Sequence, residues 1–168
     1  MHAVLKLGVL ALPVSAAQAG AVYGQELPGY DPSVLAGVSA VRLGVIASSY
    51  ESTVTETALA ALAREVVTDE LAAAGVAISD TSPVALLAVV TALATPDGVA
   101  YLAHLQIWER VDRLRSETQE DDFALTWRSG AVPSWSSRST FLRHLEETLG
   151  AHARLFVSEH RAGNPGSR

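Results

Sequence analysis

Alternating apolar and polar residues over Val99–Arg115 constrain the fold more than any other stretch of the sequence. Successive side chains of a β-strand point to opposite faces of a sheet, so this pattern predicts a long, half-buried strand. One set of alternate positions is apolar: Val99, Tyr101, Ala103, Leu105 and Ile107. The other set is mixed and is predicted to face water or a binding partner: His104, Gln106, Trp108 and Arg110.

The preceding segment, Val84–Thr95, is apolar at nearly every position. Its Ala and Leu residues also favour a helix, but the tight turn at Pro96-Asp97-Gly98 favours a β-hairpin that pairs Val84–Thr95 with Val99–Arg110. Since such a strand is apolar on both faces, both faces need cover. The two helices predicted below are expected to cover one face of the sheet. We expect the opposite face of the sheet to be covered by the N-terminal arm at residues 20–37, a second copy, an amphiphilic ligand or a partner protein.

A first helix is predicted over Thr53–Ala74, where apolar residues recur at helical spacing. Thr53 and Glu56 have the spacing of a capping box, in which each side chain bonds a backbone N–H at the helix start. Gly75 follows as a natural C-terminal cap.

A second helix is predicted to begin at Ser136 or Ser137 and to run to about Arg161. It carries histidines at intervals of eight residues: His144, His152 and His160. Eight residues rotate a helix by about 80° beyond whole turns, so the three histidines do not share one face. We therefore predict solvated histidines and no metal site.

The remaining strands are predicted at residues 38–48, 76–79 and 123–128, which gives the element order β-α-β-β-β-β-α. This order predicts an α+β fold, specifically a two-layer sandwich. In it, two helices cover one face of an antiparallel or mixed sheet of four or five strands. The single domain is predicted to span residues 38–162.

The N-terminal residues have the pattern of an export signal. Lys6 precedes an apolar run that is too short to cross a bilayer, and Ala17-Gln18-Ala19 places small residues where signal peptidase cleaves. We therefore predict a signal peptide over residues 1–19, cleavage between Ala19 and Gly20, and a periplasmic or secreted protein. Residues 20–37 are predicted to form a flexible arm or linker, and residues 163–168 a frayed tail.

No sequence motif indicates catalysis or cofactor binding. The chain contains no cysteine, no G-x-S-x-G elbow, no glycine-rich phosphate loop and no calcium-loop spacing. Its formal net charge is −6 and it lacks a basic cluster, which argues against nucleic-acid binding. We predict no cofactor, no metal site, no transmembrane span and no enzymatic activity.

The order β-α-β-β-β-α after an export signal resembles the layout of bacterial envelope domains such as the LPS-assembly lipoproteins and the amino-terminal domain of TolB. The resemblance covers element order alone and carries over no residue roles, and the lack of a cysteine departs from the lipoproteins. It implies a domain of the cell envelope.

We therefore expect an exported, non-enzymatic accessory or binding domain that acts through the sheet surface around His104, Gln106, Trp108 and Arg110. Its partner is expected to be an envelope protein or a second copy. The alternative is a carrier of an apolar small molecule or lipid, which requires an apolar cavity. A third hypothesis is a hydrolase, which requires scattered Ser, His and carboxylate groups to converge in one cleft.

Overall fold

The structure, a computed structural model, describes residues 32–111 and 122–166. The helices and strands are η2 (Pro32–Leu35), β1 (Ala40–Tyr50), α1 (Glu56–Ala74), β2 (Ala77–Ile78), β3 (Val84–Thr95), β4 (Gly98–Val111), β5 (Asp122–Arg128), β6 (Ser134–Ser136) and α2 (Phe141–Gly163). The predicted α+β class and element order are confirmed, with η2 and β6 as additions. The predicted signal peptide, its cleavage site at Ala19 and Gly20, and residues 20–31 of the predicted arm lie outside the described residues.

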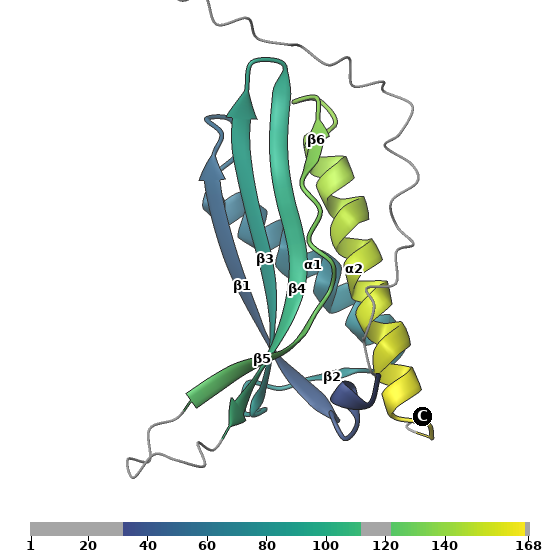
Figure 1. Ribbon diagram of the computed structural model, residues 1–168. Helices are drawn as coiled ribbons and strands as arrows, with labels where there is room; N and C mark the ends of the chain where they lie inside the picture. The colour runs from purple at the N-terminus through teal and green to yellow at the C-terminus, as the bar shows by residue number, and fades with distance from the viewer. Residues whose placement is uncertain (1–31, 112–121, 167–168) are drawn as a thin grey trace, which may run out of the picture. The chain divides into compact units, whose positions relative to one another are not determined.

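The six strands form one mixed sheet in the order β2-β1-β3-β4-β5, with β6 also paired to β4 (Figure 1). Strand β1 is parallel to both of its neighbours, β2 and β3. The predicted antiparallel hairpin of β3 and β4 is confirmed, but its register differs by one residue from the prediction. Val84 lies opposite Glu109 and Thr95 opposite Gly98, because only Pro96 and Asp97 form the turn and Gly98 belongs to β4. The far edge of β4 is shared, because β5 pairs with its second half and β6 with its first.

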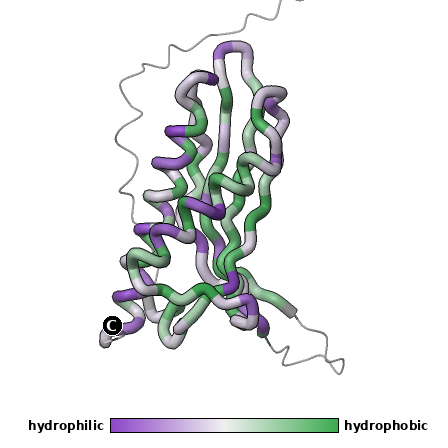
Figure 2. The backbone as a smooth tube through the Cα atoms, turned by 180° about the vertical axis from the view of Figure 1, so that it is seen from behind, coloured by the Kyte–Doolittle hydropathy of each residue, from purple (hydrophilic) through white to green (hydrophobic). Residues whose placement is uncertain are grey.

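Both helices pack on the same face of the sheet, as predicted. Helix α1 lies over β1 and β3, α2 lies over β4, and the two helices contact each other. The strands are largely hydrophobic, whereas hydrophilic and hydrophobic residues alternate along the helices (Figure 2). The core lies between these layers and includes alternate residues of the hairpin strands, which are Leu86, Ala88, Val90, Ala92, Val99, Ala103, Leu105 and Ile107.

Helix α1 begins three residues later than predicted, and the expected capping box does not form. The N-cap is Thr55, whose side chain accepts a hydrogen bond from the backbone N–H of Ala58 at 3.1 Å. Thr53 instead donates its hydroxyl to the buried carboxylate of Glu51 at 3.1 Å. The C-terminal cap is as predicted, since Gly75 has a φ of 75° in the left-handed region.

The predicted start of α2 is also wrong, because the helix begins at Phe141. Ser136 belongs to β6, where its backbone is paired opposite Val99. The hydroxyls of Ser136 and Ser137 both bond Thr140 Oγ1 at 2.8 Å, so they stabilise the turn before the helix. None of the described helices is long and apolar enough to cross a membrane.

The first described residues are held against the end of α2. Leu35 of η2 is fully buried, and its carbonyl accepts a hydrogen bond from the Asn164 side chain at 2.7 Å. The Asn164 side chain also accepts from the backbone N–H of Gly37 at 2.7 Å. Residues 32–37, at the end of the predicted arm, therefore pack onto the domain.

Candidate functional site

None of the described elements covers the face of the sheet opposite the helices (Figure 1). We call it the open face. The large apolar side chains exposed on it are Ile46, Tyr50, Leu93, Phe123, Leu125 and Trp135. The strand register places Tyr50 beside Leu93, and Ala100 lies between Leu93 and Trp135. Because folded monomers rarely expose large contiguous apolar patches, the open face is the candidate binding surface.

The four residues predicted to form a partner surface occupy alternate positions of β4 on the open face: His104, Gln106, Trp108 and Arg110. The first three are joined by hydrogen bonds. Trp108 Nε1 and Gln106 Oε1 lie 2.8 Å apart, and Gln106 Nε2 lies 2.8 Å from His104 Nε2. Arg110 is exposed at the end of the row.

These hydrogen bonds fix the protonation of His104. An indole N–H can only donate, so the Gln106 amide oxygen faces Trp108 and its NH₂ group faces His104. An amide NH₂ group can also only donate, so Nε2 of His104 is the acceptor. The single proton of the neutral imidazole therefore lies on Nδ1.

His104 is buried, with only 6% of its surface exposed, although the sequence predicted a surface histidine. Its neighbours on the open face include Val89, which lies opposite it in β3, and Gln106, which is hydrogen-bonded to the ring. The alternating pattern of one strand does not predict this burial. Burial lowers the pKa of His104 below its ordinary value, and the nearby charge of Arg128 lowers it further. Among the described residues, Nδ1 has no hydrogen-bond partner.

His152 of α2 lies close to His104 and to the backbone of Ala103. Burial lowers the pKa of His152, a cationic His104 would lower it further, and a hydrogen bond with the Ala103 backbone acts in the opposite direction. Beside this position the edge of β4 is irregular. There the backbone N–H of Leu105 donates to the side-chain hydroxyl of Ser129 at 2.8 Å, instead of to a backbone carbonyl of a neighbouring strand.

The prediction that the α2 histidines are solvated is wrong for two of them, since His152 and His160 are only 8% and 7% exposed. An offset of about 80° still fits within the broad buried stripe of a helix that packs on a sheet. His160 Nε2 donates to the carbonyl of Val38 at 2.6 Å. The position of His152 next to His104 was not predicted from the sequence, and the periodicity of α2 alone gives no signal for it. No cluster of potential metal ligands is found within residues 32–111 and 122–166.

Replacing Gln106 with glutamate is expected to raise the pKa of His104. The carboxylate would still accept from Trp108, but it would face His104 with an anionic acceptor instead of a donor, which favours the imidazolium form. An NMR titration of the histidine ring protons measures this pKa in the wild type and in Gln106→Glu. Gln106→Met, which carries no charge, is the control, and an equal shift in both variants would contradict the assigned hydrogen bonds.

Ser136 and His144 are a serine–histidine pair, with Ser136 Oγ 2.9 Å from His144 Nδ1. The Arg143 guanidinium must donate to the other ring nitrogen, Nε2, at 3.1 Å. The neutral ring therefore carries its proton on Nδ1 and donates it to Ser136. A general base would have to accept the serine proton, so this geometry is opposite to that of an activated nucleophile. Ser136 is also buried.

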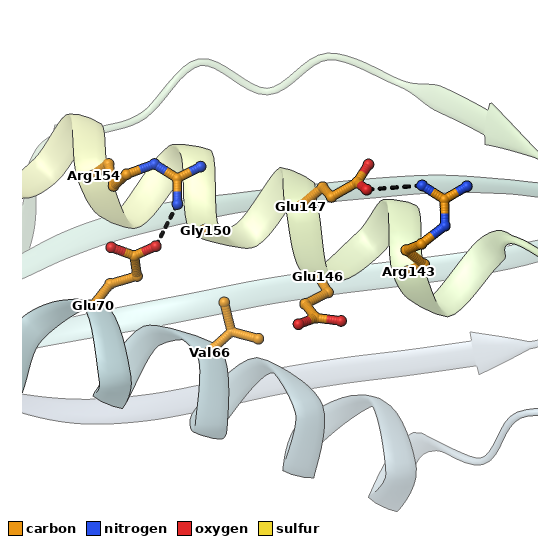
Figure 3. Close-up of a pocket in the computed structure, with 7 residues that line it drawn as sticks. All are labelled: Val66, Glu70, Arg143, Glu146, Glu147, Gly150 and Arg154. Atoms are coloured by element: carbon orange, nitrogen blue, oxygen red, sulfur yellow. Dashed lines mark hydrogen bonds and ion pairs between the residues drawn. The ribbon is translucent and has the colours of Figure 1, made fainter.

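A groove of about 490 Å³ lies between the outer surfaces of α1 and α2 (Figure 3). Its lining is largely charged, and two ion pairs occupy it. Arg154 pairs with Glu70 across the helices, and Arg143 pairs with Glu147 along α2 at 2.8 Å. This charged groove differs from the apolar cavity between sheet and helices that the carrier hypothesis requires.

No protein-family model matches this chain, and neither a curated protein nor a solved structure was found to match it. The geometry of the described residues is therefore the basis for assigning a function.

Proposed function

We propose that the protein is an exported, non-enzymatic binding domain that acts through the open face of its sheet. The observation that carries the proposal is the uncovered apolar surface itself. Leu93 and Trp135 are 53% and 57% exposed there, whereas Leu86, Ala88, Val90 and Ala92 on the opposite face of β3 are fully buried. A partner that covers this face would remove apolar area from water, which is favourable by roughly 25 cal/mol per Å² before the costs of association.

The row formed by His104, Gln106 and Trp108 gives this surface a fixed polar centre. Its hydrogen bonds hold the amide and the indole in single orientations. Side chains that are already ordered lose less entropy when a partner binds. We propose that the partner contacts the half-buried Gln106 and Trp108, which the buried His104 holds in place, together with the apolar side chains around them, and that it is a protein of the cell envelope.

The double variant Leu93→Lys/Leu125→Lys tests this function, since it places two charges on the open face at exposed positions. The wild-type chain and the variant are immobilised, and proteins captured from the envelope fraction of the native host are quantified by mass spectrometry. We expect a partner that the wild type enriches and the double variant loses, because an unpaired charge in an apolar interface is costly.

Leu155→Lys is the matched control. Leu155 is 41% exposed but lies on α2, away from the sheet, so this variant should retain the partner. Circular dichroism must show that all three proteins are folded. Equal capture by the wild type and the double variant would overturn the proposal that the open face is the binding surface.

A further inference from the structure

Strand β1 has a long unpaired edge among the described residues. On one side it pairs with β3 from Arg42 to Tyr50. On the other side β2 pairs only with Ala40 and Val41. In Figure 1, β1 accordingly forms the margin of the sheet along most of its length. An unpaired edge strand offers a row of backbone donors and acceptors to an added strand.

The odd-numbered residues of β1 direct their backbone groups toward this edge. The carbonyl of Val41 accepts there from the backbone N–H of Ser79 at 2.9 Å, on the side of β2. Two further residues of the same set, Leu43 and Ser49, are bonded by side chains of α1. By the same alternation, Val45 and Ala47 present their N–H and C=O groups outward at the centre of the edge. This central segment contains no proline and no charged side chain.

The two ends of the free segment carry opposite charges. Arg64 of α1 donates to the carbonyl of Leu43 at 3.4 Å. At the other end, the carboxylate of Glu56 accepts from the backbone N–H of Ser49 at 3.4 Å. Ile46 lies midway between Leu43 and Ser49. The Arg64 cation and the Glu56 anion are therefore three residues from Ile46 along β1, on opposite sides of it.

We propose that β1 pairs antiparallel with β1 of a second copy, about a two-fold axis at Ile46, so that the two sheets become continuous. In this register Val45 of each copy exchanges backbone hydrogen bonds with Ala47 of the other. Leu43 stands opposite Ser49, which brings Arg64 of each copy next to Glu56 of the other. The edge is therefore complementary to itself in charge as well as in hydrogen bonding.

The same register covers exposed side chains of β1 on the open face. Ile46, which is 52% exposed, packs against its own copy at the axis. Tyr50, which is 69% exposed, stands opposite Arg42, where a cation can lie over the aromatic ring. Along β1 itself, no like charges face each other in this register. These matches favour a second copy over an unrelated peptide, which would match the backbone but not the paired charges of α1.

Disulfide cross-linking of a single-cysteine variant tests this pairing, because the chain contains no cysteine of its own. Ile46→Cys places two sulfurs at a non-hydrogen-bonded antiparallel pair, where the Cα atoms are about 4.5 Å apart, within the range of a disulfide. Under mild oxidation, the full chain carrying Ile46→Cys should become a covalent dimer. Leu93→Cys, on the same face and equally exposed, should remain largely uncross-linked.

Light scattering of the wild-type chain should give twice the mass of one chain. Arg64→Glu should shift the protein toward the monomer, because it places two carboxylates together at each end of the interface. The double variant Glu56→Arg/Arg64→Glu should restore the dimer. Circular dichroism confirms that each variant is folded.

A monomeric wild type, or equal cross-linking at residues 46 and 93, would overturn the proposal. A monomer in which residues 1–31 are cross-linked to β1 would assign the edge to the chain's own N-terminal segment instead. The pairing concerns the sheet edge and not the partner face, so its failure would leave the proposed binding function untouched.

Discussion

Replacing Trp127 with alanine should lower the free energy of unfolding by about 3–5 kcal/mol. The indole is 2% exposed and packs edge-on against Phe156 of α2, with the ring centroids 5.4 Å apart. Its Nε1 donates to the carboxylate of Glu159 at 2.6 Å. Alanine would leave a cavity between β5 and α2 and remove a charged hydrogen bond. Since domains of this size are stable by only about 5–15 kcal/mol, the loss is a large fraction of the total.

Trp135→Ala is the matched control for this prediction. Trp135 is 57% exposed on β6, where its indole donates to Thr95 Oγ1 at 3.3 Å. Removing it creates no buried cavity, so we expect a loss of about 1 kcal/mol or less. Urea unfolding followed by circular dichroism measures both variants. Similar losses at the two positions would show that Trp127 does not hold β5 against α2.

The β-hairpin was predictable because its signals are local. Val84–Thr95 has a composition that also suits a helix, and the Pro96-Asp97-Gly98 turn together with the alternation of the next strand decided between them. The structure contains that hairpin, although the pairing is shifted by one residue because Gly98 begins β4 instead of closing the turn. The direction of the open face also followed from alternation, which is why His104, Gln106 and Trp108 were placed on one face.

The cap of α1 was not predictable from local signals. Thr53 and Thr55 are both acceptable N-cap residues, and only the position of Glu51 separates them. Its carboxylate is buried and bonds Thr53, which removes that residue from the helix start. The position of this carboxylate depends on Arg138, which lies far along the sequence and reaches it at 3.6 Å.

The burial of His104 and His152 was missed for a similar reason. Each residue was assessed on its own strand or helix, and each pattern there is compatible with solvent. His152 is buried because α2 packs against β4, next to the irregular edge at Ser129. His104 lies on the open face, where it is next to Val89 of β3 and Gln106 of its own strand. Contacts between distant elements of this kind are not encoded in the periodicity of either one.

Acidification should destabilise the folded protein between about pH 7.5 and 5. Both His104 and His152 have lowered pKa values in the folded state, chiefly through burial, whereas in the unfolded chain they return to the ordinary value of 6.5. As the pH falls through 6.5, the unfolded chain takes up protons that the folded protein does not. The two histidines therefore make their full contribution to stability above pH 6.5, their ordinary pKa. This contribution is lost as the pH falls toward their lower pKa values in the folded state.

Each histidine can contribute a slope of at most about 1.4 kcal/mol per pH unit, and the two add. Urea unfolding at a series of pH values measures the slope. His104→Gln and His152→Gln should each flatten it, because each removes one titrating group. Val90→Ala is the control, because it truncates a buried apolar residue of β3 that does not titrate. It should lower the free energy of unfolding by the same amount at each pH, so its slope should equal that of the wild type.

The measurement should stop near pH 5 so that a second acid-sensitive group does not contribute. Although burial raises the pKa of Glu51, its hydrogen bonds from Thr53 and Ser52 and the charge of Arg138 lower it overall, below the ordinary 4.5. Glu51 therefore remains ionised in this window. If the free energy of unfolding changed with pH equally steeply in His104→Gln, His152→Gln and the wild type between pH 7.5 and 5, the two histidines would not be the cause of the pH dependence.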